Sequence, residues 1–590
     1  MAKHFAFQNL PSVKKRRSMF DLTHGIKTSM SAGKLYPIFC QEVYPGDTFK
    51  DKTSIVARVT SAFLKPVMDN CFMDTYFFFV PNRLVMDKWS AVMGENKNSA
   101  WAPSAYASAP TAAAGVVKSG TVGDYLGLPV DDTLSIPSGV NILPFRAYAL
   151  IWDEWFRDQN NQQPMNIDKG EVAGSNEVYN DSDWSPTNYF GKLAPVGKMH
   201  DYFTSCLPSP QKGSAVELGL TELPARVLPV AGAGINPETS ATSPSLFPDA
   251  SELNSLLQSA GYTTTGASFG LGTIYMGLNA DSFATSLSTN QTVGLNGAAS
   301  FAGAKPKLSN FTTDNPTGSA GTAYINNLVA YDSGAELTPT TINELRYAFA
   351  LQRMLEKDAL GGSRYTEYLL SHFGVSSPDA RLNRSELLGG HRFPISVQQV
   401  SQTSQPSESS PLGAVGAYSL SNGECRFTKG FVEHGFVIGV AMIRQYHTYQ
   451  QGIERFWFRS KRTDYYDPVF ANIGEQPVYK SELYALGETD LKAIPFGYNE
   501  AWADLRYRPN RVTGQMRSNI SNSLDIWHFA DDYENAPTLN SQFIEETPVY
   551  IDRSLAVPSS SQDQFIVDIY HKCPAYRCLP VYSTPSMLGR

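Results

Sequence analysis

Short stretches in which apolar and polar residues alternate recur along most of the chain. Residues 54–62 put apolar side chains on one face and Arg58 on the other, the pattern of a half-buried strand. Residues 71–81 are apolar on both faces apart from Asp74 and Thr75, so we expect a helix or another chain to cover the second face of this strand. The two-residue period returns at residues 393–397, 436–442 and 565–569.

Three segments show the helical period instead, namely residues 145–158, 342–358 and 365–373. Pro144 suits the first turn of the first helix. Thr341 and Glu344 form a capping-box pattern at the second, and Gly374 ends the third. Strands recur from about residue 36 to about residue 572, with connections much longer than hairpin turns. The sequence therefore predicts sheets assembled from distant segments.

Composition supports a folded chain rich in strands and loops. The chain has 590 residues, of which 42% are hydrophobic, 12% aromatic and 18% charged. These values exclude wholesale disorder, and 45 Gly with 37 Pro argue against a helical bundle. Residues 261–325 are almost uncharged and rich in small residues, which is typical of a linker. Their scattered aromatic residues favour order through assembly instead.

The net charge of −8 is unevenly distributed. Residues 1–35 carry seven Lys and Arg against the single acid Asp21, so a basic arm precedes an acidic body. Four consecutive cations can neutralise phosphates whatever the base sequence, which predicts a nucleic-acid contact. These residues are Lys14, Lys15, Arg16 and Arg17. A solvated basic tail that only aids solubility is the alternative interpretation.

Other features argue against secretion, membrane insertion and metal binding. Six irregularly spaced cysteines suggest folding in a reducing compartment, and neither a signal peptide nor a membrane span is expected. His571, Cys573 and Cys578 offer three metal ligands at unusual spacing without a second pair, so free thiols are the preferred interpretation.

No catalytic site is predicted. The string GASFG at 266–270 matches a nucleophile elbow but lacks the flanking strand and helix that this motif needs. Adjacent acids point in different directions on a helix or strand, so they make poor acid–base partners. Such pairs are Asp153 with Glu154, Asp531 with Asp532, and Glu545 with Glu546.

Several long strings, in order, resemble the major capsid protein of microviruses, in particular the gokushovirus branch. The first two are RSMFDLTHGIKTSMSAGKLYPIFCQEVYPGDTFK at 17–50 and PVMDNCFMDTYFFFVPNRLVMDKW at 66–89. Others are LPFRAYALIWDEWFRDQN at 143–160, SRYTEYLLSHFGVSSPDARLNRSELLGG at 363–390, RFWFRSKRTDYYDPVFANIGEQPV at 455–478 and FGYNEAWADLRYRPNRVTG at 496–514. The resemblance spans nearly the whole chain.

The resemblance implies a mainly β fold, an eight-stranded antiparallel jelly roll of viral capsid type with very long inter-strand insertions that contain a few helices. It implies sixty copies in a T=1 icosahedral shell, with fivefold, threefold and twofold neighbours, around a circular single-stranded DNA genome. The basic arm at 1–35 then precedes one jelly-roll domain at 36–590. Within that domain, a surface insertion at 225–335 would form threefold protrusions and contact a host surface receptor.

Further implied partners are a small basic DNA-binding phage protein and a minor capsid or pilot protein. The implied location is the virion, after assembly in the bacterial host cytoplasm. No membrane insertion, cofactor, metal or catalytic residue is expected.

Two other function classes compete with a shell protein. A carbohydrate-binding jelly-roll lectin suits the Tyr and Trp content, but the basic arm and the long resemblance count against it. A phage glycosidase would need two carboxylates in a cleft, and nothing in the sequence indicates such a pair. Particle size separates the shell from the lectin.

Overall fold

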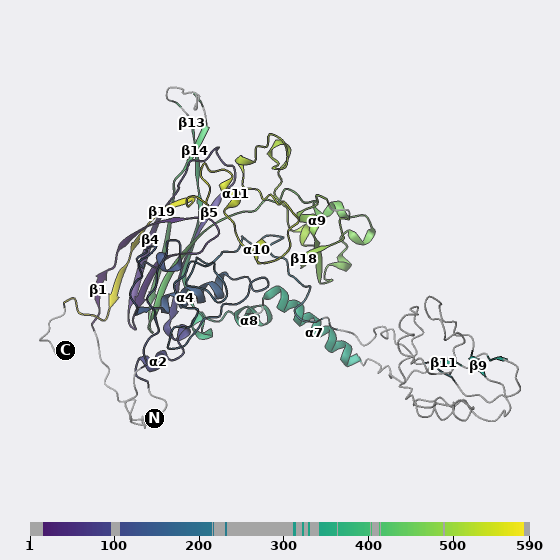
Figure 1. Ribbon diagram of the computed structural model, residues 1–590, viewed down its shortest axis with the longest axis horizontal. Helices are drawn as coiled ribbons and strands as arrows, with labels where there is room; N and C mark the ends of the chain where they lie inside the picture. Colours follow the sequence, from purple (N-terminus) through teal and green to yellow (C-terminus); the bar gives the residue numbers. More distant parts are fainter. Residues whose placement is uncertain are drawn as a thin grey trace. The chain divides into compact units, whose positions relative to one another are not determined.

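The structure is a computed structural model that describes residues 16–95, 107–214, 342–362, 364–401, 415–487 and 490–582, with a few short segments between them. The chain divides into two compact units, Met1–Ser214 with Gln352–Arg590, and Ala215–Leu351. The described residues are mainly β, and every named strand pair is antiparallel (Figure 1).

A six-stranded sheet in the first unit combines both ends of the chain. β1 pairs with β20 and β2 with β19, both β19 and β20 pair with one edge of β4, and β15 pairs with the other edge. The strands are β1 (Ser18–Asp21), β2 (His24–Met30), β4 (Thr48–Val59), β15 (Ser421–Gly430), β19 (Phe565–Lys572) and β20 (Pro574–Arg577).

A four-stranded sheet has the order β12-β5-β16-β3. Its strands are β3 (Tyr36–Val43), β5 (Cys71–Pro81), β12 (Glu386–Ile395) and β16 (Gly435–Gln445). Asp74, one of the two polar exceptions in β5, is fully buried between Arg392 of β12 and Arg444 of β16, which neutralise its charge. Pairing across three strands therefore explains an acid inside an apolar strand.

The two sheets pack face to face around aromatic side chains. The ring centroids of Phe77 in β5 and Phe427 in β15 are 5.0 Å apart. Phe49 and Ala575 of the six-stranded sheet join Phe39 of the four-stranded sheet in the same buried cluster. Since each sheet covers one apolar face of the other, the core is a β-sandwich.

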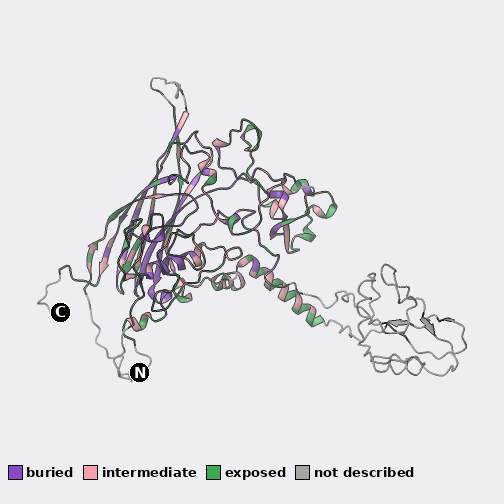
Figure 2. Cartoon of the chain, viewed as in Figure 1, coloured by how far each residue is buried: buried purple, intermediate pink, exposed green. Residues whose placement is uncertain are grey.

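Helical residues cover the opposite face of the four-stranded sheet. α4 (Leu143–Ile151) continues into a π-helical turn, η2 (Trp152–Phe156). The ring centroids of Trp155 and Phe156 lie 5.3 Å and 6.0 Å from that of Phe78 in β5. Figure 2 shows buried residues concentrated around this helix. The cover expected for the second face of residues 71–81 is thus a helix of the same chain.

A buried ion pair ties α4 to its neighbouring loops. Arg146 donates from Nε and Nη2 to the two carboxylate oxygens of Glu177, at 2.7 Å and 2.9 Å. Its Nη1 donates to the carbonyl oxygens of Gly170 and Val85, at 2.9 Å and 3.2 Å. The two charged side chains are 0% and 1% exposed, so each charge depends on the other.

The remaining elements lie in the connections. The strands are β6 (Thr111–Ala112), β7 (Val140–Asn141), β13 (Val397–Ser401), β14 (Val415–Ser419), β17 (Glu475–Tyr479) and β18 (Pro495–Glu500). The α-helices are α1 (Asn82–Val85), α2 (Trp89–Val92), α3 (Val122–Tyr125), α7 (Ile342–Gly361), α8 (Tyr365–Phe373), α9 (Lys480–Leu483), α10 (Ser541–Ile544) and α11 (Val549–Asp552). Short 3₁₀ turns include η3 (Asp379–Leu382) and η4 (Arg455–Phe458).

Most predicted elements are confirmed. β5 and α8 have the predicted bounds, and Gly374 ends α8 in the left-handed conformation at φ 69°. The first predicted helix spans α4 and η2, so it begins and ends two residues earlier than expected. α7 continues three residues further than predicted, and its expected cap, Thr341, lies outside the described residues.

The first two strands were not predicted from the sequence pattern. β1 and β2 lie within residues 1–35, the range predicted as a basic arm, and both pair with strands from the C-terminal end. β2 is an edge strand whose buried side is marked by little more than Ile26 and Met30, so its alternation is weak. Only the long-range partner reveals it as a strand.

The second unit contains four short strands within its described residues. β10 (Gly321–Ala323) pairs with β9 (Phe311–Thr313), and β11 (Leu328–Ala330) pairs with β8 (Val230–Gly232). These fall in the predicted insertion at 225–335, most of which lies outside the described residues, as does the GASFG string. Among the described helices, none has the length and apolar character required to cross a membrane.

Candidate nucleic-acid interface

The described half of the basic cluster predicted to contact nucleic acid adjoins the six-stranded sheet. Arg16 and Arg17 are exposed and directly precede β1, whereas Lys14 and Lys15 lie outside the described residues. Arg17 donates from Nη1 to Thr48 Oγ1, at the start of β4, over 3.3 Å. The described half of the cluster is therefore at the edge of the sheet, and its contact with nucleic acid stays a prediction.

The outward face of the six-stranded sheet carries further cations that the sequence analysis did not single out. In β19, exposed and buried residues alternate strictly along the strand. The outward residues of this sheet include six cationic side chains, which we call the cationic face. They are Lys27, Lys50, Lys52, Arg58, Arg426 and Lys572. A local signal existed in β4, where Lys50 and Lys52 alternate with buried residues, but the neighbouring cations come from distant strands.

A buried charge cluster brings together residues from two of the acid pairs considered in the sequence. His447 Nδ1 lies 2.8 Å from Asp531 Oδ1, and its Nε2 lies 3.0 Å from Glu546 Oε2. Lys198 Nζ lies 3.4 Å from Asp531 Oδ2. The side chains of His447, Asp531 and Glu546 are 0% exposed, so they are closed to a solute and act as structural charges.

The pKa values of His447 and Asp531 in this cluster are shifted from their ordinary values. Burial alone would lower the pKa of His447, but the adjacent carboxylates of Asp531 and Glu546 outweigh it and raise the pKa to about 10. Burial opposes ionisation of Asp531, and the charges of His447 and Lys198 overcome this and lower its pKa. The imidazole is thus a cation at neutral pH, held between two anions.

The possible ligand string near the C-terminus does not converge on one point. His571 is buried, with Nδ1 2.8 Å from Thr53 Oγ1 and Nε2 3.0 Å from the Ile38 carbonyl oxygen. Cys573 is buried and Cys578 is exposed, and both are free thiols. Within the described residues, no group of three or more His, Cys, Asp or Glu side chains is placed to hold a metal ion.

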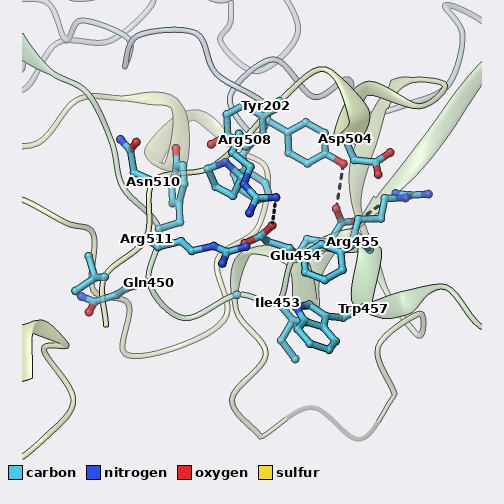
Figure 3. Close-up of a pocket in the computed structure, with 18 of the residues that line it drawn as sticks. Tyr202, Gln450, Ile453, Glu454, Arg455, Trp457, Asp504, Arg508, Asn510 and Arg511 are labelled. Carbon is cyan, nitrogen blue, oxygen red and sulfur yellow. Dashed lines mark hydrogen bonds and ion pairs between the residues drawn. The ribbon is translucent and has the colours of Figure 1, made fainter. Parts of the chain in front are cut away.

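A cavity of about 730 Å³ lies among the loops after β16. Its walls combine aromatic and arginine side chains, and Figure 3 shows Arg508 and Arg511 directed toward Glu454. The rings of Tyr202 and Tyr507 stack at 5.1 Å.

Several arginines of this cavity are paired with carboxylates. Arg455 lies 3.1 Å from Glu482, and Arg459 pairs with Asp504. Burial raises the pKa of Glu482, to which Tyr202 also donates a hydrogen bond at 3.0 Å. Because Arg455 and Arg459 have carboxylate partners on other loops, these pairs hold the loops together.

Comparison with known proteins identifies the family. Residues 8–587 match a protein-family model described as "Capsid protein (F protein)". The chain is similar to "Capsid protein VP1" of Chlamydia phage 1, with 37% identity over 98% of this chain and 97% of the relative. Proteins of the same name from Bdellovibrio phage phiMH2K (36% identity, 99% and 98% coverage) and Spiroplasma virus 4 (37%, 97% and 95%) are also similar.

The mainly β fold and these matches define a structural capsid protein of a bacteriophage, not an enzyme. The chain belongs to the capsid protein (F protein) family, and its relatives are proteins of gokushoviruses, as the resemblance in the sequence implies. A protein of this family assembles into a multi-subunit capsid and is located in the virion.

Proposed function

We propose that the chain is the major capsid protein of a small single-stranded DNA phage, with sixty copies tiling a T=1 icosahedral shell around a circular genome. The observation that carries the proposal is similarity over nearly the whole length to three proteins named as phage capsid proteins. Assembly in the bacterial host cytoplasm, a small basic DNA-binding protein and a minor capsid or pilot protein belong to the same proposal. The acidic body, with its net charge of −8 for the whole chain, supports a basic packaging partner.

We also propose that the sandwich is an eight-stranded jelly roll. The strand pairing supports this proposal when β1 and β2 are counted as one bent strand, and β19 and β20 as another. Two four-stranded sheets then result, with the orders β2-β19-β4-β15 and β3-β16-β5-β12. The chain alternates between the sheets at every step except from β5 to β12, a connection that includes the proposed insertion.

Exposed apolar side chains on the loops support assembly. Met68, Leu134, Val172, Trp457 and Val469 are each at least 68% exposed. Burial of apolar surface contributes about 25 cal/mol per Å², so contacts of modest area, repeated around a closed shell, stabilise it cooperatively. These loops are the proposed contacts with neighbouring copies.

Purified full-length protein is expected to form particles of uniform size under native conditions. Multi-angle light scattering should give a mass in the megadalton range, and electron micrographs should show closed shells. A chain that remained a stable monomer or dimer across salt and pH conditions would contradict the proposal and favour the lectin alternative.

The arm is proposed to contact the genome through Lys14, Lys15, Arg16 and Arg17. Consecutive cations attract phosphates without base specificity, and the attraction falls with salt because bound counterions are released. The exposure of Arg16 and Arg17 supports this role.

The insertion at 225–335 is proposed to form a surface protrusion that contacts a host receptor. Its support is the separate compact unit Ala215–Leu351 that contains it. Shortening this insertion is expected to leave particle formation unchanged and to reduce attachment of the phage to host cells. Loss of particles would show instead that the insertion is part of the shell framework.

A further inference from the structure

The central part of the cationic face places like charges side by side across three strands. Lys52 of β4 is the direct partner of Arg426 in β15 and of Lys572 in β19. Lys50, two residues earlier in β4, points to the same side. Neighbouring strands are about 4.8 Å apart, so these cations form one continuous patch. Like charges directly opposite each other destabilise a sheet unless an anion lies between them.

Acidic residues on the same strands compensate only part of this charge. Glu424 pairs with Lys52 at 2.9 Å and also with Arg426. The other outward acids are Asp568, 4.0 Å from Lys27, and Asp21, which accepts hydrogen bonds from Thr23 and interacts electrostatically with Lys572. Six cations thus face three carboxylates in a chain whose total charge is negative. Among the described residues, Lys50, Arg58 and Lys572 have no carboxylate within salt-bridge distance.

An accessible aromatic ring lies in the same face. Tyr570 of β19 is 53% exposed, and its direct neighbours on the flanking strands are Gly25 and Ser54. Both neighbours have little or no side chain, and about half of the Tyr570 residue is exposed. A second ring, Tyr576, lies 5.4 Å from the Lys50 ammonium. Aromatic rings interspersed with cations are typical of surfaces that bind single-stranded nucleic acid by stacking and phosphate contacts.

We propose that the cationic face binds single-stranded DNA, with its lysines and arginines neutralising phosphates and Tyr570 stacking on a base. This site rests on the proposed function, since the DNA would be the enclosed genome. The position of Arg17 supports single-stranded DNA as the ligand of the face. Arg17 belongs to the basic cluster proposed to contact the genome, directly precedes β1 and contacts β4 of the same sheet. Within the described residues, Arg17 therefore adjoins the sheet that carries the cationic face.

The test compares the wild-type full-length protein with three variants for binding of a fluorescent 30-nucleotide oligo-dT across a salt series. In the face variant, Lys50, Arg58 and Lys572 are replaced by Gln. In the matched control, the exposed Arg381, Lys461 and Arg462, which lie outside this sheet, are replaced by Gln. The face variant is expected to bind about tenfold more weakly near 0.1 M salt, with a salt slope smaller by about 2, whereas the control behaves as wild type. An arm variant with Ala at 14–17 should show an additional, separate loss.

Stacking is tested separately from charge. Tyr570→Ala is expected to weaken oligo-dT binding about fivefold or more. Tyr418→Ala, which removes an exposed tyrosine on β14, should have no effect. Because these variants keep all charges, they test the proposal even if the face variant folds poorly.

The possible outcomes distinguish a failure of the proposed DNA site from a failure of the proposed shell function. Wild-type protein that forms no particles refutes the shell, whatever binds to the face. Particles that form normally, with face-variant affinity and DNA content equal to wild type, refute the site alone. If polyglutamate binding falls as much as oligo-dT binding, and Tyr570→Ala changes neither, the face binds an acidic protein segment and the DNA assignment is wrong.

Discussion

Replacing Arg146 by Met is expected to destabilise the protein by about 3–5 kcal/mol, because Glu177 would keep a buried charge without its partner. The guanidinium makes two hydrogen bonds to Glu177 and three to backbone carbonyl oxygens, and both side chains of the pair are essentially unexposed. Urea unfolding of the unassembled chain, followed by fluorescence, measures the loss as a lower midpoint.

Two further variants separate the charge from the lost contacts. The double variant Arg146→Met with Glu177→Met is expected to be more stable than Arg146→Met alone, since no unpaired charge remains buried. Lys192→Met breaks the pair with Asp183, whose side chains are 50% and 88% exposed, and should cost less than about 1 kcal/mol. Equal losses for Arg146→Met and Lys192→Met would contradict the assigned role of the buried pair.

Features carried by neighbouring residues were predictable from the sequence. The strand at Cys71–Pro81 and the helix at Tyr365–Phe373 have the predicted bounds because their periodicity and end signals are local. The cluster at residues 14–17 was visible for the same reason. The order of strands was not predictable from periodicity, since it depends on which distant apolar faces meet, and the eight-stranded arrangement came only from the resemblance.

The cationic face and the buried cluster around His447 could not be predicted from the sequence, because their residues are far apart along the chain. Lys52 and its partners Arg426 and Lys572 become neighbours only when the register of three strands is known. His447 meets Asp531 and Glu546 across 84 and 99 residues. The sequence places these acids in adjacent pairs, and the two members of such a pair point in different directions. Nothing in the sequence predicts that one acid from each of two pairs lies on either side of a histidine.

The stability of the wild-type protein is expected to fall between about pH 6.5 and pH 10 through the titration of His447. Its ordinary pKa is about 6.5 and its folded pKa is about 10, so folding favours the protonated ring. The contribution is therefore complete below about pH 6.5, decreases as pH rises, and is absent above the folded pKa. His447→Gln removes this cation from between Asp531 and Glu546, and should cost about 3–5 kcal/mol at pH 6.

The stability difference between wild type and His447→Gln, measured as a function of pH, distinguishes loss of the charge from loss of packing. The gap between the unfolding midpoints of wild type and His447→Gln should be largest at pH 6 and narrow steadily toward pH 10. His200→Gln alters an exposed histidine and should follow the wild-type curve throughout. If the gap for His447→Gln stays constant from pH 6 to pH 10, the ring contributes shape and hydrogen bonds but no charge. A narrowing gap means that a buried cation joins the segment after β16 to the two acidic segments before β19.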